Sequence, residues 1–273
     1  MNYRHAFHAG NFADLIKHAA LLLVLDAMTS DAKALRVMDT HAGRGLYDVG
    51  GADAIRSGEA KAGIGRLAEV GAVPDPIAAL RAEITKLNPH DGIRVYPGSP
   101  VLIAGRLRPG DSYLACELRP EEHQALAETL RGLTGVKTVC ADGFVRAADL
   151  PSVLGKTLFL IDPPFERADD YIRITETVMA GRRRMSDAGF LIWLPLKDLE
   201  TLDSFVRSLE EGSGGSILVA EARMRPLTDP LKMNGCVLVL VNLSPAVEAP
   251  LREVLKWVVD TLGENGEARL WHP

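Results

Sequence analysis

The sequence predicts an α/β fold built on a mostly parallel sheet with helices on both faces, plus a small helical insertion. Apolar runs of strand length alternate with stretches of helical spacing along most of the 273 residues. The early predicted strands are continuously apolar, which is typical of strands buried on both faces of a parallel sheet. Hydrophobic residues make up 47% of the chain and charged residues 25%, so the chain has enough apolar material for a large core.

The first 49 residues predict a buried helix, a strand and a glycine-rich turn. The helix is expected to begin after Asn11, a suitable N-cap, and its sequence FADLIKHAALLLVLDAM is apolar on all sides in its later turns. Residues 34–40, ALRVMDT, form a predicted strand that runs into the turn HAGRG. Small residues there would let a ligand approach the backbone closely, although the spacing is not that of a dinucleotide-binding loop.

Between residues 50 and 96, helical pieces are broken by Gly and Pro and strand character is weak. We therefore expect residues 50–96 to form a helical insertion in a domain made of residues 1–49 and 97–273. The second part of that domain is expected to open with a helix at Pro97 to Pro100. Later strands are predicted at residues 112–118, 136–142, 157–162, 189–196, 216–224 and 236–244. Later helices are predicted at residues 121–133, 170–185, 199–211 and 246–262.

An acidic residue ends each of the first four predicted strands: Asp39, Glu117, Asp142 and Asp162. Parallel strands gather their carboxyl ends at one sheet edge, where such folds bind ligands, so the four acids predict a lined cleft. Glu117 would accept ribose hydroxyls, and Asp142 would accept an adenine amine. The alternative for each is a solvated acid or a turn. Glu117 lies roughly 70 residues after the glycine turn rather than about 20, and the insertion accounts for the excess.

The stretch LFLIDPPFERADDY places Asp162, Pro163, Pro164 and Phe165 directly after a buried strand. Two prolines fix two φ angles and remove two backbone donors. An aromatic amine is a poor nucleophile because its lone pair is delocalised, and a carboxylate with a nearby carbonyl could accept both of its N–H bonds. The carboxylate could also take the released proton, and Phe165 could stack on a base. The alternative is a structural turn.

The N-terminal segment carries basic residues interleaved with aromatic ones, including Tyr3, Arg4 and Lys17. This pattern is typical of proteins that bind single-stranded or flipped nucleotides; the alternative is a capped, partly buried helix entry. No cysteine or acid completes a recognised zinc spacing with its histidines, so we expect no metal. The run GRRRM is typical of a solvated helix end.

Charge and hydropathy limit the class of protein. The net charge is −5, so no overall positive field points to nucleic acid. The longest apolar stretch, residues 19–25, is too short to cross a bilayer. The polar N-terminus does not read as a signal peptide, and three cysteines cannot all pair. We expect a cytoplasmic protein without membrane contact.

Several motifs in a fixed order resemble one protein family. Asp-Pro-Pro followed by an aromatic residue is similar to the signature of amino-group methyltransferases that use S-adenosylmethionine. The wider set is NYRHAFHAGNFADLIKH, DTHAGRGLYD, YPGSP, ELRPEEH, ADGF and DPPFE. Together these motifs, spread over residues 2–166, resemble the bacterial 23S ribosomal RNA adenine N6-methyltransferase family of the J type.

The resemblance implies a Rossmann-like class I methyltransferase that transfers a methyl group from S-adenosylmethionine to the N6 amine of an adenine in 23S ribosomal RNA. It implies a monomer acting on naked or partly assembled RNA. The implied cofactor site is lined by His18, His41, Ser99, Glu117, Asp142, Gly143 and Asp162. The implied catalytic residues are Asp162, Pro163 and Phe165. The implied RNA contacts are Tyr3, Arg4, Lys17 and Phe165, the last standing where Tyr is common.

Three alternative functions share parts of this pattern. A DNA adenine N6-methyltransferase would use the same motif, but with a larger or more basic target-reading region. A protein glutamine methyltransferase normally opens the motif with Asn, and Asp162 counts against it. A non-catalytic nucleoside- or RNA-binding module would not need the intact Asp162 and its two prolines.

Overall fold

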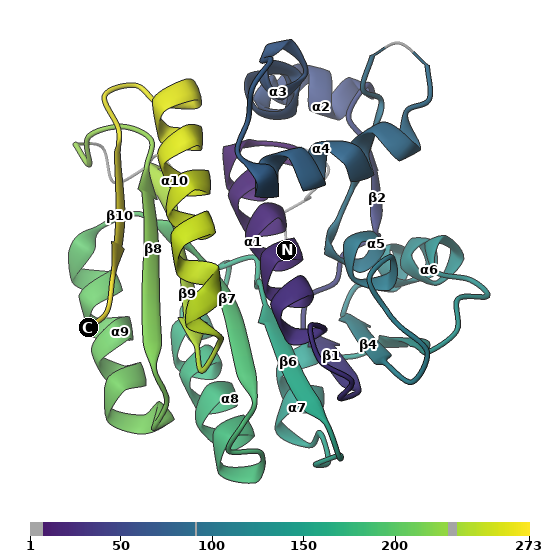
Figure 1. Cartoon of the computed structure of the whole chain (residues 1–273), viewed down its shortest axis with the longest axis vertical. Helices are drawn as coiled ribbons and strands as arrows, with labels where there is room; N and C mark the ends of the chain where they lie inside the picture. The colour runs from purple at the N-terminus through teal and green to yellow at the C-terminus, as the bar shows by residue number, and fades with distance from the viewer. Residues whose placement is uncertain (1–7, 91, 229–233) are drawn as a thin grey trace.

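The computed structural model describes residues 8–90, 92–228 and 234–273. Within them an eight-stranded sheet lies between two layers of helices (Figure 1). Its strands are β1 (Leu35–Asp39), β4 (Ser112–Glu117), β5 (Val136–Cys140), β6 (Lys156–Ile161), β7 (Gly189–Leu196), β8 (Ile217–Arg223), β9 (Gly235–Val241) and β10 (Glu267–Trp271). The helices of the two layers are α1 (Phe12–Met28), α5 (Ser99–Ala104), α6 (Pro120–Thr129), α7 (Gly143–Ala148), α8 (Asp170–Arg184), α9 (Leu199–Ser213) and α10 (Glu248–Leu262).

The strand order across the sheet is β10-β8-β9-β7-β6-β1-β4-β5. Strands β5, β4, β1, β6 and β7 are parallel, whereas β9 runs antiparallel to both β7 and β8, and β10 runs antiparallel to β8. The chain leaves β1 for β4 on one side and returns to β6 on the other. This reversal of strand order places a binding crevice beyond the carboxyl ends of β1, β4 and β6.

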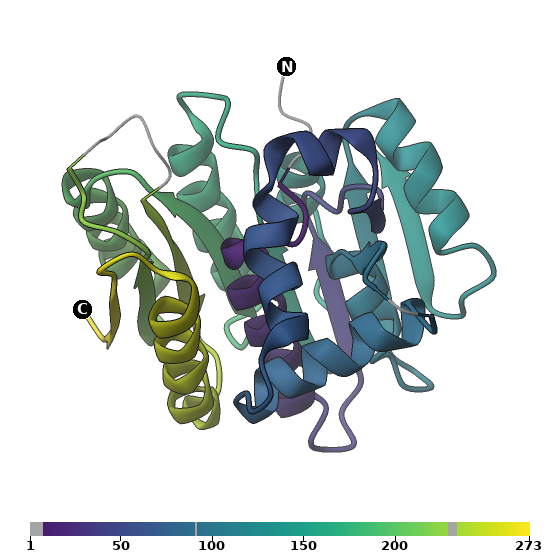
Figure 2. The same ribbon diagram turned by 90° about the horizontal axis from the view of Figure 1, so that it is seen from above.

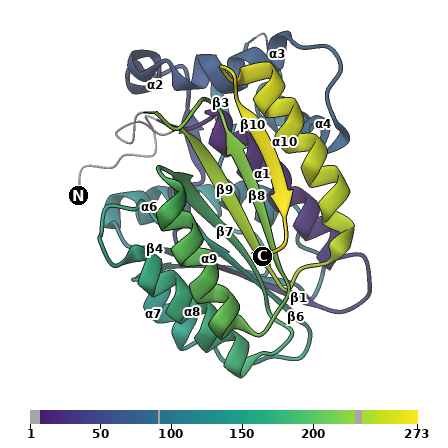
Figure 3. The same ribbon diagram turned by 90° about the vertical axis from the view of Figure 1, so that its left-hand side faces the viewer.

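The two faces of the sheet bury separate hydrophobic clusters. Along β6, Leu158 and Leu160 join the cluster under α1 and α10, while Phe159 and Ile161 join the cluster under α7, α8 and α9. This alternation follows from the two-residue period of a strand. Figure 3 shows α8 and α9 on one face and α10 on the other, and Figure 2 shows the same layers from above. The predicted coverage of both faces is confirmed.

Helix α1 packs against one face of the sheet and is largely buried, as its sequence predicts. The side chain of Asn11 accepts hydrogen bonds from the backbone N–H groups of Ala13 and Asp14, which confirms the N-cap. Thirteen of its 17 residues are buried, including Lys17 and His18. Buried polar side chains on an otherwise apolar helix need partners, and those partners lie at the cleft described below.

The region predicted as an insertion contains α2 (Ala52–Ser57), a π-helical turn η2 (Lys61–Gly65), α3 (Arg66–Glu69) and α4 (Asp75–Leu87). Helix α4 packs against α1 and α10, and η2 packs against α1. The apolar side chains of this region join the same core as α1, among them Ile64, Leu67 and Leu80. The division into an insertion and a surrounding domain stays a prediction.

Several local elements differ from the sequence prediction. A two-stranded ribbon pairs β2 (Leu46–Asp48) with β3 (Val95–Pro97), so Pro97 ends a strand and α5 begins only at Ser99. The two strands are separated along the chain by helices α2 to α4, which hides their pairing from local patterns. Edge strand β10 was also missed, because its sequence EARLW is too polar to read as a buried strand. None of the described helices has the length and apolar composition needed to cross a membrane.

Candidate functional site

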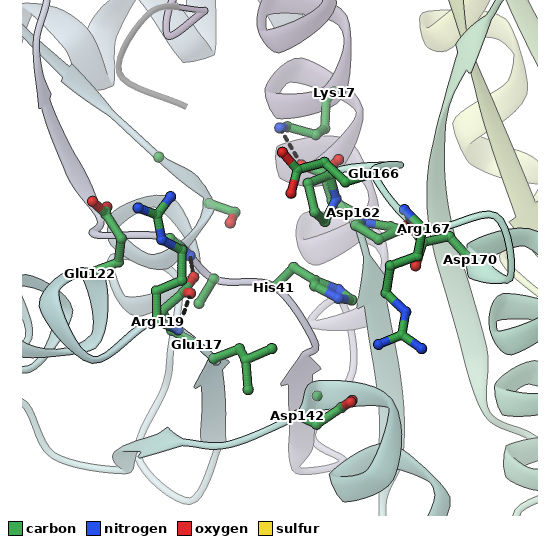
Figure 4. Close-up of a pocket in the computed structure, with 18 of the residues that line it drawn as sticks. Lys17, His41, Glu117, Arg119, Glu122, Asp142, Asp162, Glu166, Arg167 and Asp170 are labelled. Carbon is green, nitrogen blue, oxygen red and sulfur yellow. Dashed lines mark hydrogen bonds and ion pairs between the residues drawn. The ribbon is translucent and has the colours of Figure 1, made fainter. Parts of the chain in front are cut away.

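A cleft opens at the carboxyl ends of β1, β4, β5 and β6 (Figure 4). It holds roughly 1100 Å³ of non-protein space, part of it open to solvent. The structure brings together at its walls all of the implied cofactor residues: His18, His41, Ser99, Glu117, Asp142, Gly143 and Asp162. Lys17 and Pro163 also line it.

The turn after β1 forms one wall of the cleft and depends on glycine. Gly43 has a φ of +66°, and a Cβ there would lie 2.2 Å from the hydroxyl of Tyr47. A Cβ on Gly143 would lie 1.9 Å from the carbonyl oxygen of Thr40, so the start of α7 contacts this turn directly. Both positions therefore favour glycine, and both residues line the cleft.

Glu117 ends β4 and is fixed by two backbone donors. The N–H of Gly43 donates to its Oε2 over 3.0 Å, and the N–H of Arg119 donates to its Oε1 over 2.8 Å. Burial raises the pKa of the Glu117 carboxyl above its ordinary value, against the effect of these two hydrogen bonds. Each carboxylate oxygen keeps a second lone pair, so Glu117 can still accept hydroxyl donors from a ligand.

Asp39 lies beneath the cleft rather than on its wall, which corrects the prediction that all four strand-end acids line it. The side chain is fully buried. Its Oδ2 accepts hydrogen bonds from the hydroxyls of Ser99 and Tyr113, both at 3.0 Å, and its Oδ1 accepts the N–H of His41 at 3.2 Å. Burial raises the pKa of Asp39 to about 7. Asp39 therefore holds two cleft residues, Ser99 and His41, in place.

Asp142 is predicted as the last residue of a strand but stands two residues beyond it, because β5 ends at Cys140 and Asp142 forms the N-cap of α7. Its Oδ1 accepts the N–H groups of Phe144 at 3.0 Å and Val145 at 3.4 Å. Its Oδ2 accepts a hydrogen bond from Nη2 of Arg173 at 2.6 Å. Burial raises the pKa of Asp142, but the hydrogen bond and charge of Arg173 outweigh burial and hold it below its ordinary value.

His41 presents a neutral ring to the cleft. It packs edge-on against Phe144, with ring centroids 4.8 Å apart. Burial lowers the pKa of His41 to about 4, despite the nearby carboxylates of Asp162 and Asp142. The imidazole is therefore uncharged at neutral pH and does not repel a positively charged ligand.

Asp162 follows β6 directly and pairs with a buried lysine. Nζ of Lys17 lies 2.5 Å from Oδ2 of Asp162 (Figure 4) and 3.0 Å from Oδ1 of Asp14. The Lys17 side chain is only 6% exposed. Burial alone would lower the pKa of Lys17, but the charges of Asp14 and Asp162 hold it well above its ordinary value. Lys17 is thus a cation held between two carboxylates.

The sequence prediction missed the Lys17–Asp162 ion pair and the role of Asp14. One signal was available, because Asp14 and Lys17 stand three residues apart on a helix that is apolar on nearly all sides. Charged residues at buried helix positions need partners, but the sequence does not reveal a partner 145 positions away. The predicted contact between Lys17 and RNA stays a prediction.

Phe165 completes the elbow in a conformation that is uncommon for its residue type. Its φ is +51°, in the left-handed region that a bulky side chain rarely adopts. Its half-buried ring lies 5.1 Å from that of Tyr171 and 5.9 Å from that of Trp193, measured between centroids. Such strain persists only where surrounding contacts impose it. The predicted stacking of a base on Phe165 stays a prediction.

The remaining predicted site residues are His18, Tyr3 and Arg4. His18 is buried at the cleft, and its Nδ1 lies 2.7 Å from the hydroxyl of Tyr96. Tyr3 and Arg4 lie outside the described residues, so their predicted RNA contacts stay predictions. No group of three or more His, Cys, Asp or Glu side chains that could hold a metal ion is found within the part of the chain that the structure describes.

The charges lining the cleft are unequal. Among the described residues, the carboxylates at its wall are Glu117, Glu122, Asp142, Asp162, Glu166 and Asp170. The basic side chains there are Lys17, Arg119, Arg167 and Arg173. Six acids against four bases, with a neutral His41, give the wall an excess of negative charge, which suits a ligand that carries positive charge.

Comparisons with known proteins agree on one family. The model of the family described as "Ribosomal RNA large subunit methyltransferase D, RlmJ" matches residues 32–272. "Ribosomal RNA large subunit methyltransferase J" of Haemophilus influenzae is 34% identical over 97% of this chain and 95% of its own length. The protein of the same name from Escherichia coli is 31% identical over 97% of this chain and 95% of its own length.

A solved structure supports the same assignment. The crystal structure of a Legionella pneumophila protein is 27% identical and superposes with a TM-score of 0.89, covering 97% of this chain and 98% of that one. The family model spans most of the chain, and both named relatives match almost end to end. The chain therefore belongs to the RlmJ family of ribosomal RNA large subunit methyltransferases.

Proposed function

We propose that this chain transfers a methyl group from S-adenosylmethionine to the N6 amine of an adenine in 23S ribosomal RNA. The chain belongs to a family of ribosomal RNA methyltransferases, and one structural observation supports the choice of an adenine amine as the target. Asp162 and its two prolines follow β6 at the wall of a cleft that also holds Glu117 and Asp142. The amine-accepting elbow and the nucleoside-binding acids thus face one cavity.

The residues at the cleft fit the cofactor. Glu117 would accept the ribose hydroxyls, since both of its oxygens are fixed by backbone donors and keep free lone pairs. Asp142 would accept the adenine amine. Gly43 and Gly143 also line the cleft, and a Cβ at either position would collide with neighbouring protein atoms. His18, His41, Ser99 and Asp162 would complete the site.

The cofactor, when bound, supplies an electrophilic methyl group on a positively charged sulfur. The excess of carboxylates and the neutral ring of His41 favour a positively charged group in the cleft. The site has no need of a covalent enzyme intermediate, because positioning and charge stabilisation suffice for a direct transfer.

Asp162 would accept an N–H of the target adenine and so favour the geometry in which the nitrogen lone pair can attack. The oxygens of an ionised carboxylate offer about four acceptor positions, and Lys17 occupies one of them. Pro163 and Pro164 lack N–H groups, so the elbow presents carbonyl oxygens to the amine without competing backbone donors. Asp162 is also placed to take the proton that the amine releases.

Lys17 would hold Oδ2 of Asp162 in place, because its Nζ lies 2.5 Å from that oxygen. Lys17 also contacts Asp14, so its single positive charge is divided between two carboxylates and does not fully compensate that of Asp162. Phe165 would stack on the flipped adenine, and Tyr3 and Arg4 would contact the RNA.

The substrate would be naked or partly assembled 23S ribosomal RNA, bound by a monomer in the cytoplasm. The net charge of −5 predicts few phosphate contacts and a shallow dependence of RNA affinity on salt. Residues 50–96 would form an insertion in the catalytic domain of residues 1–49 and 97–273.

A labelling experiment separates this function from its alternatives. The purified protein is incubated with S-adenosylmethionine labelled on the methyl group, together with total RNA, genomic DNA or a protein extract from cells that lack this enzyme. We expect label in large-subunit RNA alone. Label in DNA or protein would support one of the alternative methyltransferases, and cofactor binding without any labelled product would support a non-catalytic module.

A further inference from the structure

We propose that Arg173 is a positioning residue that fixes the carboxylate of Asp142 toward the amine of the cofactor's adenine, and so sets the preference of the site for a 6-amino purine. The inference rests on the proposed function, because it takes the nucleoside of S-adenosylmethionine as the ligand at Asp142. It assigns a role to a side chain on α8, outside the four strand ends that form the site.

The carboxylate of Asp142 is held at both oxygens by different parts of the fold. Oδ1 accepts the N–H groups at the start of α7, from Phe144 at 3.0 Å and Val145 at 3.4 Å. Oδ2 accepts Nη2 of Arg173 at 2.6 Å, which is short for a charge-assisted hydrogen bond. The plane of the carboxylate is therefore fixed, and Oδ2 keeps a lone pair for a further donor.

Arg173 is itself fixed by a second contact. Its guanidinium carbon lies 4.5 Å from the centroid of the Phe144 ring, a cation–π arrangement that is attractive across the ring face. The Phe144 ring in turn meets His41 edge-on at 4.8 Å. Arg173 stands in the first turn of α8, just after the elbow that holds Asp162. The guanidinium is thus held between the carboxylate of Asp142 and the ring of Phe144.

Two features distinguish the Arg173–Asp142 pair from an ion pair that only stabilises the packing of two helices. Both Arg173 and Asp142 line the cleft, so the fixed carboxylate faces the ligand. Their side chains are also only 20% and 30% exposed, which limits screening of the interaction by solvent.

A fixed carboxylate discriminates between purines better than a mobile one. A 6-amino group donates to it, whereas a 6-oxo group would place a second acceptor against a carboxylate that cannot turn away. Without Arg173, the Oδ2 side of the carboxylate is free to rotate toward solvent when a 6-oxo purine binds. Loss of Arg173 should therefore weaken binding of the 6-amino ligand and reduce discrimination against the 6-oxo ligand.

The test measures binding by calorimetry, without turnover. The ligands are S-adenosylhomocysteine and its 6-oxo analogue, S-inosylhomocysteine. The proteins are the wild type, Arg173→Ala, Arg173→Lys and the control Arg252→Ala, whose arginine forms an exposed ion pair with Glu248 on α10. Thermal melting followed by circular dichroism checks folding. If Arg173→Ala does not fold, Arg173→Lys provides the comparison, because lysine keeps the charge but lacks the planar guanidinium group.

We expect the wild type and Arg252→Ala to bind the 6-amino ligand about 10- to 100-fold more tightly than the 6-oxo analogue, the range for one hydrogen bond to a charged group. Arg173→Ala should bind S-adenosylhomocysteine about tenfold more weakly and discriminate less than tenfold, with Arg173→Lys between the two. Unchanged discrimination, or tighter binding of S-adenosylhomocysteine, in a folded Arg173 variant would overturn the inference alone. A wild type that binds neither ligand would instead contradict the proposed function.

Discussion

Nζ of Lys17 donates a hydrogen bond to Oδ2 of Asp162 over 2.5 Å, although the two residues stand 145 positions apart in the sequence. Lys17 belongs to the buried helix α1, and Asp162 opens the elbow after β6. The pair connects the first helix of the described chain to the residue that we propose accepts the adenine amine. It also explains why an otherwise apolar helix carries a buried cation.

The substitution Asp162→Asn should reduce methyl transfer by about 10²- to 10⁴-fold, the range for loss of an acid–base group. The amide keeps the size of the side chain. It loses the negative charge that strengthens the hydrogen bond from the amine and the basicity needed to take the proton. Single-turnover transfer of labelled methyl to the RNA measures the effect, with S-adenosylhomocysteine affinity measured in parallel. The control Asp203→Asn removes an exposed carboxylate on α9. Transfer by Asp162→Asn at the rate of this control would rule out the proposed role.

The substitution Lys17→Met should destabilise the protein by about 3–5 kcal/mol, because it leaves the buried carboxylate of Asp14 and the partly buried carboxylate of Asp162 without their shared cation. The control Lys256→Met breaks an exposed pair with Asp260 and should cost less than about 1 kcal/mol. Urea unfolding gives both free energies. Equal losses in the two variants would show that burial of the Lys17 cluster has no energetic consequence.

The pH dependence of stability should change in opposite directions when Asp39 or His41 is replaced. The pKa of Asp39 is raised from 3.8 to about 7, so the folded protein holds an extra proton and stability falls as pH rises through this window. The pKa of His41 is lowered from 6.5 to about 4, so the unfolded chain holds the extra proton and stability rises with pH. The two contributions oppose each other between about pH 4 and 6.5.

Urea unfolding at several pH values between 4.5 and 6.5 separates these contributions. Relative to the wild type, Asp39→Asn should gain stability with rising pH, by up to about 1.4 kcal/mol per unit. His41→Asn should lose stability relative to the wild type over the same interval. Curves that run parallel to the wild type in both variants would contradict the assigned pKa shifts.

The substitution Gly143→Ala should destabilise the protein by about 1–3 kcal/mol and weaken S-adenosylhomocysteine binding. The added Cβ would lie 1.9 Å from the carbonyl oxygen of Thr40, and a backbone atom cannot rotate away. Gly71→Ala is the matched control, because its Cβ would meet nothing within 4 Å. Thermal melting and calorimetry measure both variants. A Gly143→Ala protein as stable as Gly71→Ala would show that the turn can move without cost.

Local patterns predicted most of the fold. The apolar runs of β6 and β7 and the amphipathic α10 were all found, because each element buries a continuous face that its own sequence displays. The β2–β3 ribbon was missed, because its pairing depends on residues separated by the insertion. Strand β10 was missed, because an edge strand needs little apolar sequence.

The same distinction applies to the site. Glu117 and Asp142 were predicted because the ends of parallel strands converge at one edge, a property of the fold class. The contacts of Lys17 with Asp162, and of Arg173 with Asp142, join side chains from separate elements. They depend on how α1 and α8 pack against the sheet, which no spacing along the chain encodes. Asp39 was misplaced for a related reason, since its depth below the cleft depends on Ser99 and Tyr113.

Nucleoside analysis of the methylated RNA tests the central claim most directly. Unmodified 23S ribosomal RNA is incubated with the protein and methyl-labelled S-adenosylmethionine, then digested to nucleosides and separated by chromatography with mass detection. The account predicts label only in N6-methyladenosine with the wild type, formed at least about 100-fold more slowly by Asp162→Asn. Label in a ribose-methylated nucleoside or in another base, or N6-methyladenosine formed equally by Asp162→Asn, would contradict it.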